Sequence, residues 1–350
     1  MKRFGLAMAA FGFAASVFAY NPPAGGQNLY GISGPRQLTS ASSAAGGGLF
    51  FADPGSIVYN PALTAYEDRI QLDFDFSYLG DFDDDSGASF QTGLMVPMKM
   101  FVATGLVNGT FISSEDMDLG KSFTVKAGLA KEITSALSVG ANLYTGFLLS
   151  DGGDWALGAD LGVLYRRETF GFAKDFRIGA SLLNLGKPFG GTTYGVDWYN
   201  KDNEEPTESE FFPALATLRA GAAAVLFEKG DLAGGASFDI SAPAFMDLAF
   251  DLGMQVSIKD TFFVSVAETI DILEISQKCY NLIPSIGIGV KFNLAANNAY
   301  LASHSWENSE MMASLAWKRM YGGINAISGG ANLKLGKQDT DPPVIRLWNE

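Results

Sequence analysis

Cysteine and histidine are nearly absent from this chain of 350 residues, and its basic residues are fewer than its acidic ones. The single cysteine, Cys279, excludes an intramolecular disulfide framework. The single histidine, His304, excludes a histidine-rich metal site and makes histidine-based catalysis a poor hypothesis. The 24 basic residues face 38 acidic ones, a net charge of −14, and such a surface repels nucleic acid. We therefore expect no enzyme activity, no cofactor, no metal site and no nucleic-acid partner.

The chain also lacks a long apolar run with the character of a membrane-spanning helix. The best uncharged run covers residues 133–150, but its residues alternate between two faces. One parity is mostly apolar and the other is small or polar: Leu137, Val139, Ala141, Leu143 and Phe147 against Ser138, Gly140, Asn142 and Gly146. A helix of about 20 residues has no reason to alternate. Strands that cross lipid do alternate, because one face meets hydrocarbon and the other meets the lumen.

The first nineteen residues have the layout of a secretory signal. Lys2 and Arg3 give a positive start, residues 4–15 form an apolar core, and residues 17–19 make a small-residue cleavage site. We expect residues 1–19 to be a signal peptide that directs export of the protein from the cytoplasm.

The stretch from Ser43 to Tyr78 changes character half-way. Its first part is rich in small residues and holds two turn-like motifs, Asp53-Pro54-Gly55 and Asn60-Pro61-Ala62. Its second part alternates without a break. The apolar face carries Leu72, Phe74, Phe76 and Tyr78, and the polar face carries Gln71, Asp73, Asp75 and Ser77. This period of two predicts the first strand of a membrane barrel, with Gln71, Asp73, Asp75 and Ser77 facing the lumen.

About fourteen strands are predicted from residue 69 onward. Their approximate spans are 69–79, 88–97, 99–111, 122–132, 136–148, 154–167, 175–186, 212–227, 230–240, 245–257, 260–270, 283–294, 308–318 and 321–336. The predicted fold is all-β: a transmembrane antiparallel β-barrel over residues 69–337, with residues 20–68 as a hatch inside it and 338–350 as a periplasmic tail. A barrel of this size leaves a lumen that about 50 irregular residues can fill.

The connections predict the direction of the strands. Those after even strands are mostly short, and those after odd strands are often longer and acidic, as in residues 80–87, 112–121 and 187–211. Because bacterial barrels have short periplasmic turns and longer outer loops, the first strand should run outward. Three connections depart from this rule: 241–244 and 319–320 are short, and 295–307 is long and could contain a misplaced strand.

Residues 44–65 resemble the FadL family of outer-membrane transporters. The matching features are the small-residue run Ala44–Gly48, the turn Ala52-Asp53-Pro54, and Tyr59 before Asn60-Pro61-Ala62; an aromatic alternating strand follows. Among FadL-like proteins the chain is most similar to an uncharacterised treponemal outer-membrane group. The resemblance implies fourteen strands, a hatch in the lumen and transport of long-chain fatty acids or other hydrophobic molecules, with outer-membrane lipid as surroundings. The family's usual glycine after Asn-Pro-Ala is Leu63 here.

These observations lead to a set of functional hypotheses. The leading one is passive uptake of hydrophobic small molecules, with long-chain fatty acids as the expected ligand. The residues expected to gate the hatch are Asp53, Pro54, Gly55, Asn60, Pro61 and Ala62. Leu49, Phe50 and Phe51 either contact a ligand or pack the hatch against the wall. The alternative function is a non-transporting barrel that carries a surface partner protein, with residues 187–211 as its contact surface.

Overall fold

The computed structural model describes most of the chain from Ile32 to Gly336. The described residues are 32–39, 43–49, 52–80, 86–112, 120–149, 153–189, 192–193, 208–209, 216–245, 247–272, 275, 282–295, 308–319 and 325–336. The predicted signal peptide, Phe50, Phe51, Cys279 and the tail after Gly336 lie outside these ranges, as does most of the predicted contact surface 187–211.

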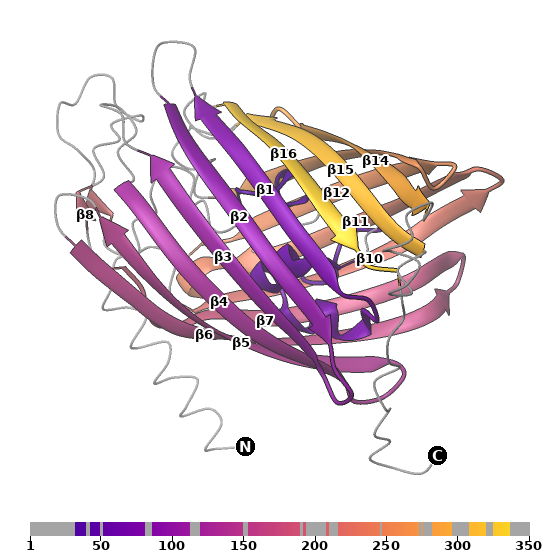
Figure 1. Ribbon diagram of the computed structural model, residues 1–350, viewed down its shortest axis with the longest axis horizontal. Helices are drawn as coiled ribbons and strands as arrows, with labels where there is room; N and C mark the ends of the chain where they lie inside the picture. The colour runs from indigo at the N-terminus through magenta and orange to yellow at the C-terminus, as the bar shows by residue number, and fades with distance from the viewer. Residues whose placement is uncertain are drawn as a thin grey trace.

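Fourteen strands form one closed antiparallel barrel (Figure 1). They are β1 (Gln71–Gly80), β2 (Ser86–Pro97), β3 (Val102–Ile112), β4 (Gly120–Glu132), β5 (Leu137–Leu149), β6 (Gly153–Phe170), β7 (Ala173–Lys187), β10 (Thr217–Lys229), β11 (Leu232–Ala242), β12 (Ala249–Ile258), β13 (Phe262–Asp271), β14 (Ser285–Ala295), β15 (Asn308–Arg319) and β16 (Asn325–Lys334). Each predicted strand overlaps one of these. The prediction of a barrel of about fourteen strands is confirmed.

The barrel closes where β1 pairs with β16 in ten consecutive residue pairs, from Gln71–Lys334 to Gly80–Asn325. Consecutive barrel strands are neighbours throughout. Because β14 pairs directly with β15, no barrel strand lies between them, and the misplaced strand considered for 295–307 is excluded from the wall. Two short strands that the sequence did not predict, β8 (Thr192–Thr193) and β9 (Glu208–Ser209), pair with each other within the β7–β10 connection.

The two faces of β1 differ as their alternation predicts. The apolar parity points outward, where Phe74 is 60% exposed, and the polar parity is buried. The same outward apolar pattern recurs around the wall, for example at Leu143, Leu161, Met254 and Ile288. A closed barrel with an apolar exterior satisfies its backbone hydrogen bonds internally and meets lipid outside. The protein is an integral barrel of the bacterial outer membrane.

Only short helices accompany the barrel in the described ranges. They are α2 (Pro35–Leu38), η3 (Pro54–Val58), η4 (Pro61–Tyr66) and η5 (Pro243–Phe245). None of the helices that the structure describes has the length and apolar character needed to cross a membrane.

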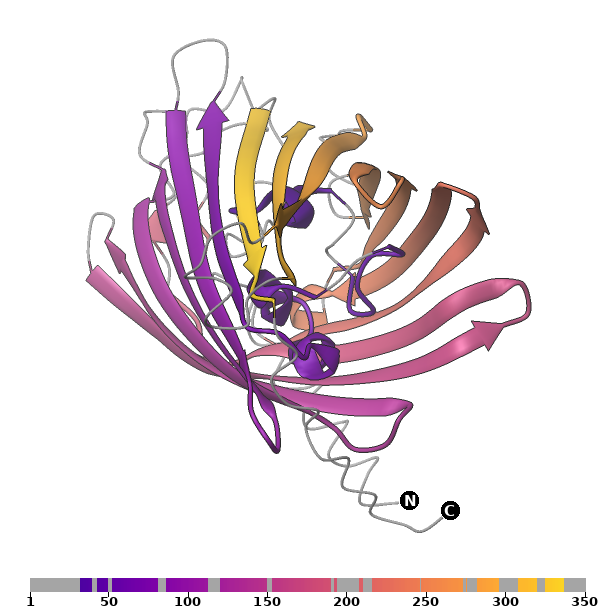
Figure 2. The same cartoon turned by 45° about the vertical axis from the view of Figure 1, so that its right-hand side comes forward.

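The described residues between Ile32 and Tyr66, here called the N-terminal segment, lie within the ring of strands (Figures 1 and 2). Part of this segment packs by apolar contact. Leu63, the residue that replaces the family's usual glycine, is buried in a cluster with Ala45 and Ala62 of the segment and Leu164 and Ala223 of the wall. A leucine at this position therefore joins the segment to the wall.

One seam of the wall is shorter than the rest. β13 and β14 share six residue pairs, from Phe262–Val290 to Ala267–Ser285, whereas every other pair of neighbours shares eight or more. Pro284 precedes the first residue of β14 and has no backbone N–H to donate to a ladder. The pairing therefore stops at Ser285, although β13 continues to Asp271.

Candidate functional site

The two turn-like motifs of the N-terminal segment are the starts of short helices. The Asp53 side chain accepts a hydrogen bond from the Ser56 backbone N–H at 2.9 Å, and Pro54 is the first residue of η3. The Asn60 side chain accepts from the Ala62 N–H at 2.9 Å, and Pro61 is the first residue of η4. A capping residue followed by proline is a favourable helix start, so both predicted turns are corrected to capped 3₁₀ helices.

Asn60 also fixes the segment to the wall. Its side-chain amide donates to the backbone carbonyls of Ala44, at 2.7 Å, and Val163, at 3.0 Å. The residue is fully buried. A Cβ atom on Gly162 of β6 would lie 1.9 Å from the Asn60 Oδ1 atom, so this wall position has room only for glycine. Close backbone approach explains part of the chain's content of 41 glycines among 350 residues.

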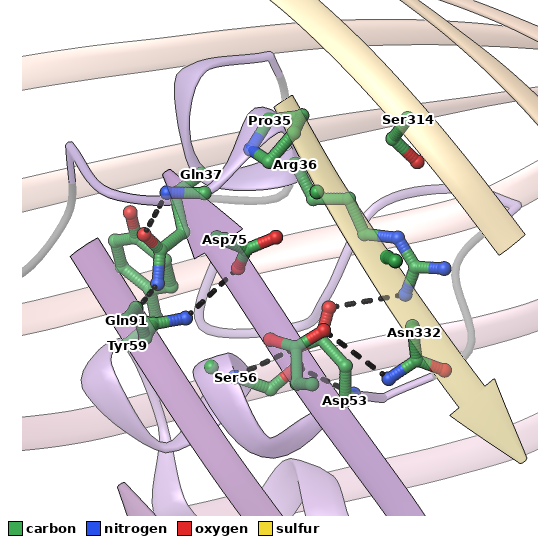
Figure 3. Close-up of a pocket in the computed structure, with 15 residues that line it drawn as sticks. Pro35, Arg36, Gln37, Asp53, Ser56, Tyr59, Asp75, Gln91, Ser314 and Asn332 are labelled. Atoms are coloured by element: carbon green, nitrogen blue, oxygen red, sulfur yellow. Dashed lines mark hydrogen bonds and ion pairs between the residues drawn. The ribbon is translucent and has the colours of Figure 1, made fainter. Parts of the chain in front are cut away.

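A polar cluster joins α2 and η3 to β1 and β2 (Figure 3). Arg36 of α2 forms an ion pair with Asp53 at 3.0 Å. Gln37 donates to the Gln91 side chain at 2.9 Å, and Gln91 donates to Asp75 at 3.1 Å. These side chains surround a cavity of only about 20 Å³, so the cluster holds the segment against the wall and leaves no room for an organic ligand.

The four predicted lumen-facing residues of β1 are all buried beneath the N-terminal segment. Gln71 donates to the Ala52 carbonyl at 3.0 Å, and Ser77 donates to the Ile32 carbonyl at 2.6 Å. Asp75 accepts from Gln91, and Asp73 accepts from Asn332 of β16 at 3.4 Å. The second carboxylate oxygen of Asp73 is buried without a hydrogen-bond partner. These contacts hold the segment against the wall, and no histidine lies among them.

A second set of anchors comes from the opposite part of the wall. Asp239 of β11 accepts from the Ser43 hydroxyl at 2.8 Å and from the Ala44 N–H at 2.7 Å. Arg219 of β10 pairs with Asp239 at 2.8 Å and lies over the Tyr59 ring. Burial raises the pKa of Tyr59 above its ordinary value, so its phenol stays neutral.

An apolar cavity of about 40 Å³ lies between the N-terminal segment and β13, β14 and β15. From the segment, Leu49 lines it together with Pro35, Arg36 and Thr39. The wall contributes mainly apolar or small residues: Gln255, Phe263, Ser265, Gly287, Gly289, Met312 and Ser314, together with Val264, Ile288 and Leu315 of the outward parity. Of the predicted ligand-contact residues, Leu49 reaches this cavity, and Phe50 and Phe51 lie outside the described residues.

A larger opening of about 860 Å³ lies on the side of the barrel that carries the short turns. It is bordered by the turn residues Gly230 and Asp231 after β10 and Lys259 and Asp260 after β12, and by Gly48 and Leu49 of the segment. Among the described residues, no group of three or more Asp, Glu, Cys or His side chains is arranged to hold a metal ion.

Sequence reasoning missed most of the wall residues that contact the segment. Arg36, Gln91, Asp239, Gln255 and Phe263 carry no local motif. Alternation places the wall residues among these on a lumen face, but their partners lie up to about 200 positions away, as between Leu49 and Gln255. Such pairings depend on how the barrel closes, so no short motif could have identified them.

Neither a protein-family model nor a curated protein sequence matches the chain. Solved structures do match in fold. The toluene transporter TbuX of Ralstonia pickettii aligns with a TM-score of 0.52 at 13% identity, covering 89% of this chain and 100% of TbuX. The Pseudomonas putida toluene transporter TodX aligns with 0.54 at 11% identity, covering 89% and 100%. The monoaromatic hydrocarbon channel CymD aligns with 0.54 at 12% identity, covering 89% and 98%.

These identities are low, and the likeness shows the fold alone. The resemblance to the uncharacterised treponemal group stays a prediction. The predicted resemblance to FadL-type transporters is confirmed for the architecture: this chain has the barrel fold of the FadL-type outer-membrane transporters.

Proposed function

We propose that this protein is an outer-membrane channel for passive uptake of hydrophobic small molecules, and that long-chain fatty acids are among its ligands. The observation that carries the proposal is the apolar cavity beside Leu49, which lies inside a closed and largely polar lumen. The solved structures of similar fold, named for toluene and monoaromatic hydrocarbons, support the same class of ligand.

The N-terminal segment acts in this proposal as the hatch. The residues predicted to gate the hatch, Asp53, Pro54, Gly55, Asn60, Pro61 and Ala62, lie at the starts of its capped helices η3 and η4, and in this proposal they hold the hatch in the lumen. The cavity of about 40 Å³ is smaller than the roughly 150 Å³ that hold benzene in an engineered protein cavity. A ligand therefore passes only when side chains around the cavity move, which keeps the resting channel closed to ions.

Uptake by intact cells tests the proposal. A Gram-negative host without its own long-chain fatty acid channel would express the protein and receive either radiolabelled oleate or N-phenyl-1-naphthylamine, a dye that fluoresces on entering the cell membranes. We expect faster uptake of both than in cells with an empty vector, and little salt conductance in planar bilayers. Equal uptake in the two strains would overturn the proposal. Uptake of the dye without oleate would restrict the ligands to small apolar molecules.

A matched pair of glycine substitutions tests the apolar cavity. A Cβ atom on Gly289 would meet its nearest neighbours, Ser314 and Phe263, at ordinary distances of 3.5 and 3.6 Å, so Gly289→Leu should fold and fill the cavity. Gly105 of β3 lies on the exposed face, and nothing lies within 4 Å of its Cβ position. We expect Gly289→Leu to slow uptake and Gly105→Leu to leave it unchanged. Equal uptake by both variants would remove this cavity from the route.

A further inference from the structure

The apolar cavity and the large opening on the turn side have two lining residues in common. Leu49 of the N-terminal segment and Phe263 of β13 line both spaces. On one side of this pair the lining is mainly apolar; on the other it includes charged residues such as Glu228, Asp231 and Lys259. Two apolar side chains, Leu49 and Phe263, therefore separate the mainly apolar cavity from the opening lined by charged residues.

The attachment of Leu49 differs from that of the residues before it. Gly47 and Gly48 are held by the Arg177 guanidinium, which donates to their carbonyls at 2.5 and 3.2 Å. Gly48 also lies against the backbone of Gly235 in β11, where a Cβ atom on Gly235 would come within 2.6 Å. Leu49 itself is joined to the wall by the hydrogen bond from its backbone N–H to the Gln255 Oε1 atom, at 2.8 Å.

We propose that Leu49 and Phe263 form an inner gate between the apolar cavity and the opening on the turn side, and that Gln255 latches this gate shut. Hydrophobic ligands leave the cavity when the Leu49–Gln255 hydrogen bond breaks and the Leu49 side chain swings away from Phe263. The rest of the N-terminal segment stays in place, because Arg177, Asp239 and Asn60 anchor it independently. The inference rests on the proposed uptake function and assigns its last step to one residue pair.

The physical reason is the small cost of opening. Breaking one hydrogen bond and moving one half-buried leucine costs far less than displacing a segment with many buried polar contacts. The gate also discriminates between ligands. A hydrated ion gains nothing from an apolar constriction, whereas an apolar ligand gains by burying its surface against Leu49 and Phe263. The opening beyond the gate needs no further rearrangement, because it is already 860 Å³ in volume.

Reversible cross-linking tests the gate. In a Cys279→Ser background, the double variant Leu49→Cys/Gln255→Cys would be joined by a short, reducible bis-methanethiosulfonate reagent. The matched control is Ser33→Cys/Ser89→Cys, where the two native hydroxyls are 2.5 Å apart and join the same segment to β2, a strand that does not line the apolar cavity. Uptake of N-phenyl-1-naphthylamine would be measured before cross-linking, after cross-linking and after reduction.

We expect the 49–255 link to lower dye uptake to the level of cells without the channel, and reduction to restore it. The cross-link between positions 33 and 89 should leave uptake unchanged. Undiminished uptake through the 49–255 link would overturn the gate while leaving the proposed function intact. A block by both links would mean that the whole segment moves, which also contradicts a local gate. Absence of uptake before any cross-linking would refute the proposed function itself.

A second variant measures the latch without a cross-link. Gln255→Leu keeps the approximate size of the side chain and removes the acceptor of the Leu49 N–H. We expect about three- to tenfold faster dye uptake, the factor that the loss of one hydrogen bond gives. Unchanged or slower uptake by a correctly assembled Gln255→Leu protein would show that Gln255 is no latch.

Discussion

The N-terminal segment meets the barrel in two different ways. Toward β5, β6, β7 and β11 it is fixed by hydrogen bonds of buried side chains. Among them, Asn60 donates to the Val163 carbonyl and the Ser43 hydroxyl donates to Asp239. Toward β13, β14 and β15 it faces an apolar cavity and has fewer polar attachments among the described residues. One of them is the hydrogen bond that the Ser265 hydroxyl donates to the Thr39 hydroxyl, at 3.0 Å. The weaker side is also next to the shortest seam of the wall, between β13 and β14.

This difference separates two tasks, anchoring of the N-terminal segment and passage of a hydrophobic ligand. A buried polar contact is costly to break, because both partners lose their hydrogen bonds at once. An apolar contact can be replaced by an apolar ligand at little cost. The strongly anchored side therefore keeps the segment in the lumen, and the apolar side offers the path along which a hydrophobic molecule can move.

Removing the whole segment should have the largest effect. Deletion of residues 20–68 removes the strongly anchored and the weakly anchored contacts together. It leaves the barrel wall, whose strands pair only with one another. We expect an assembled barrel with ion conductance in planar bilayers well above that of the full chain. Identical conductance in the deletion and the full chain would show that the segment does not plug the lumen.

Breaking the anchored side should cost less than deletion but still much stability. Asn60→Leu removes three hydrogen bonds at a fully buried position. We expect a loss on the order of 3 kcal/mol or more in the free energy of unfolding, because several backbone groups are left unpaired. Urea titration of the protein in vesicles measures it. Ser138→Ala, which removes one bond to the Ala62 carbonyl, is the control, with an expected loss of about 1 kcal/mol.

The apolar side should tolerate a comparable change. Thr39→Val keeps the shape of the side chain and removes its contacts with Ser265 and with the Pro35 carbonyl. We expect at most about 1 kcal/mol of lost stability by the same titration. A loss as large as that of Asn60→Leu would contradict the division of the segment into a strongly and a weakly anchored side.

Thiol labelling should leave the protein unperturbed and decide which end of the barrel faces the periplasm. Cys279 lies in the connection after β13, outside the described residues, and the predicted direction of the strands places this connection on the cell surface. We expect a membrane-impermeant maleimide to label intact cells, and Cys279→Ser to abolish the label. Labelling only after permeabilisation would reverse the direction and put the turn-side opening outside.

The sequence predicts the strands of the barrel wall better than it predicts the contacts of the N-terminal segment inside the barrel. Several strands alternate clearly, since lipid on one face and the lumen on the other impose a period of two on each strand separately. The alternation is weaker in the eleventh strand and in the last two. Boundaries differ by a few residues, as at β10, expected from residue 212 and observed from Thr217. The short pair β8–β9 was missed because two-residue strands carry no periodic signal.

The interior was predictable only in outline. The small-residue run and the capping motifs mark an irregular segment, and alternation assigns Asp73 and Asp75 to the buried face. The partners of that segment depend on register around the whole ring, as with Asp239 and Ser43, which are 196 positions apart. Local sequence patterns cannot predict such pairs, so only the structure shows that Gln255 and Phe263 lie beside Leu49 at the apolar cavity.

The pairing of β1 with β16 ties folding to the end of synthesis. The first strand pairs with β2 along one edge, but the partner for its other edge exists only after the chain has been made as far as Lys334. Until then β1 and the last completed strand each present an open edge, the feature that invites pairing with another chain. The N-terminal segment must be enclosed as the ring forms, because its anchors on β1, β6 and β11 surround it only in the closed ring. The last ten residues of the wall thus complete both the barrel and the chamber around its first-made part.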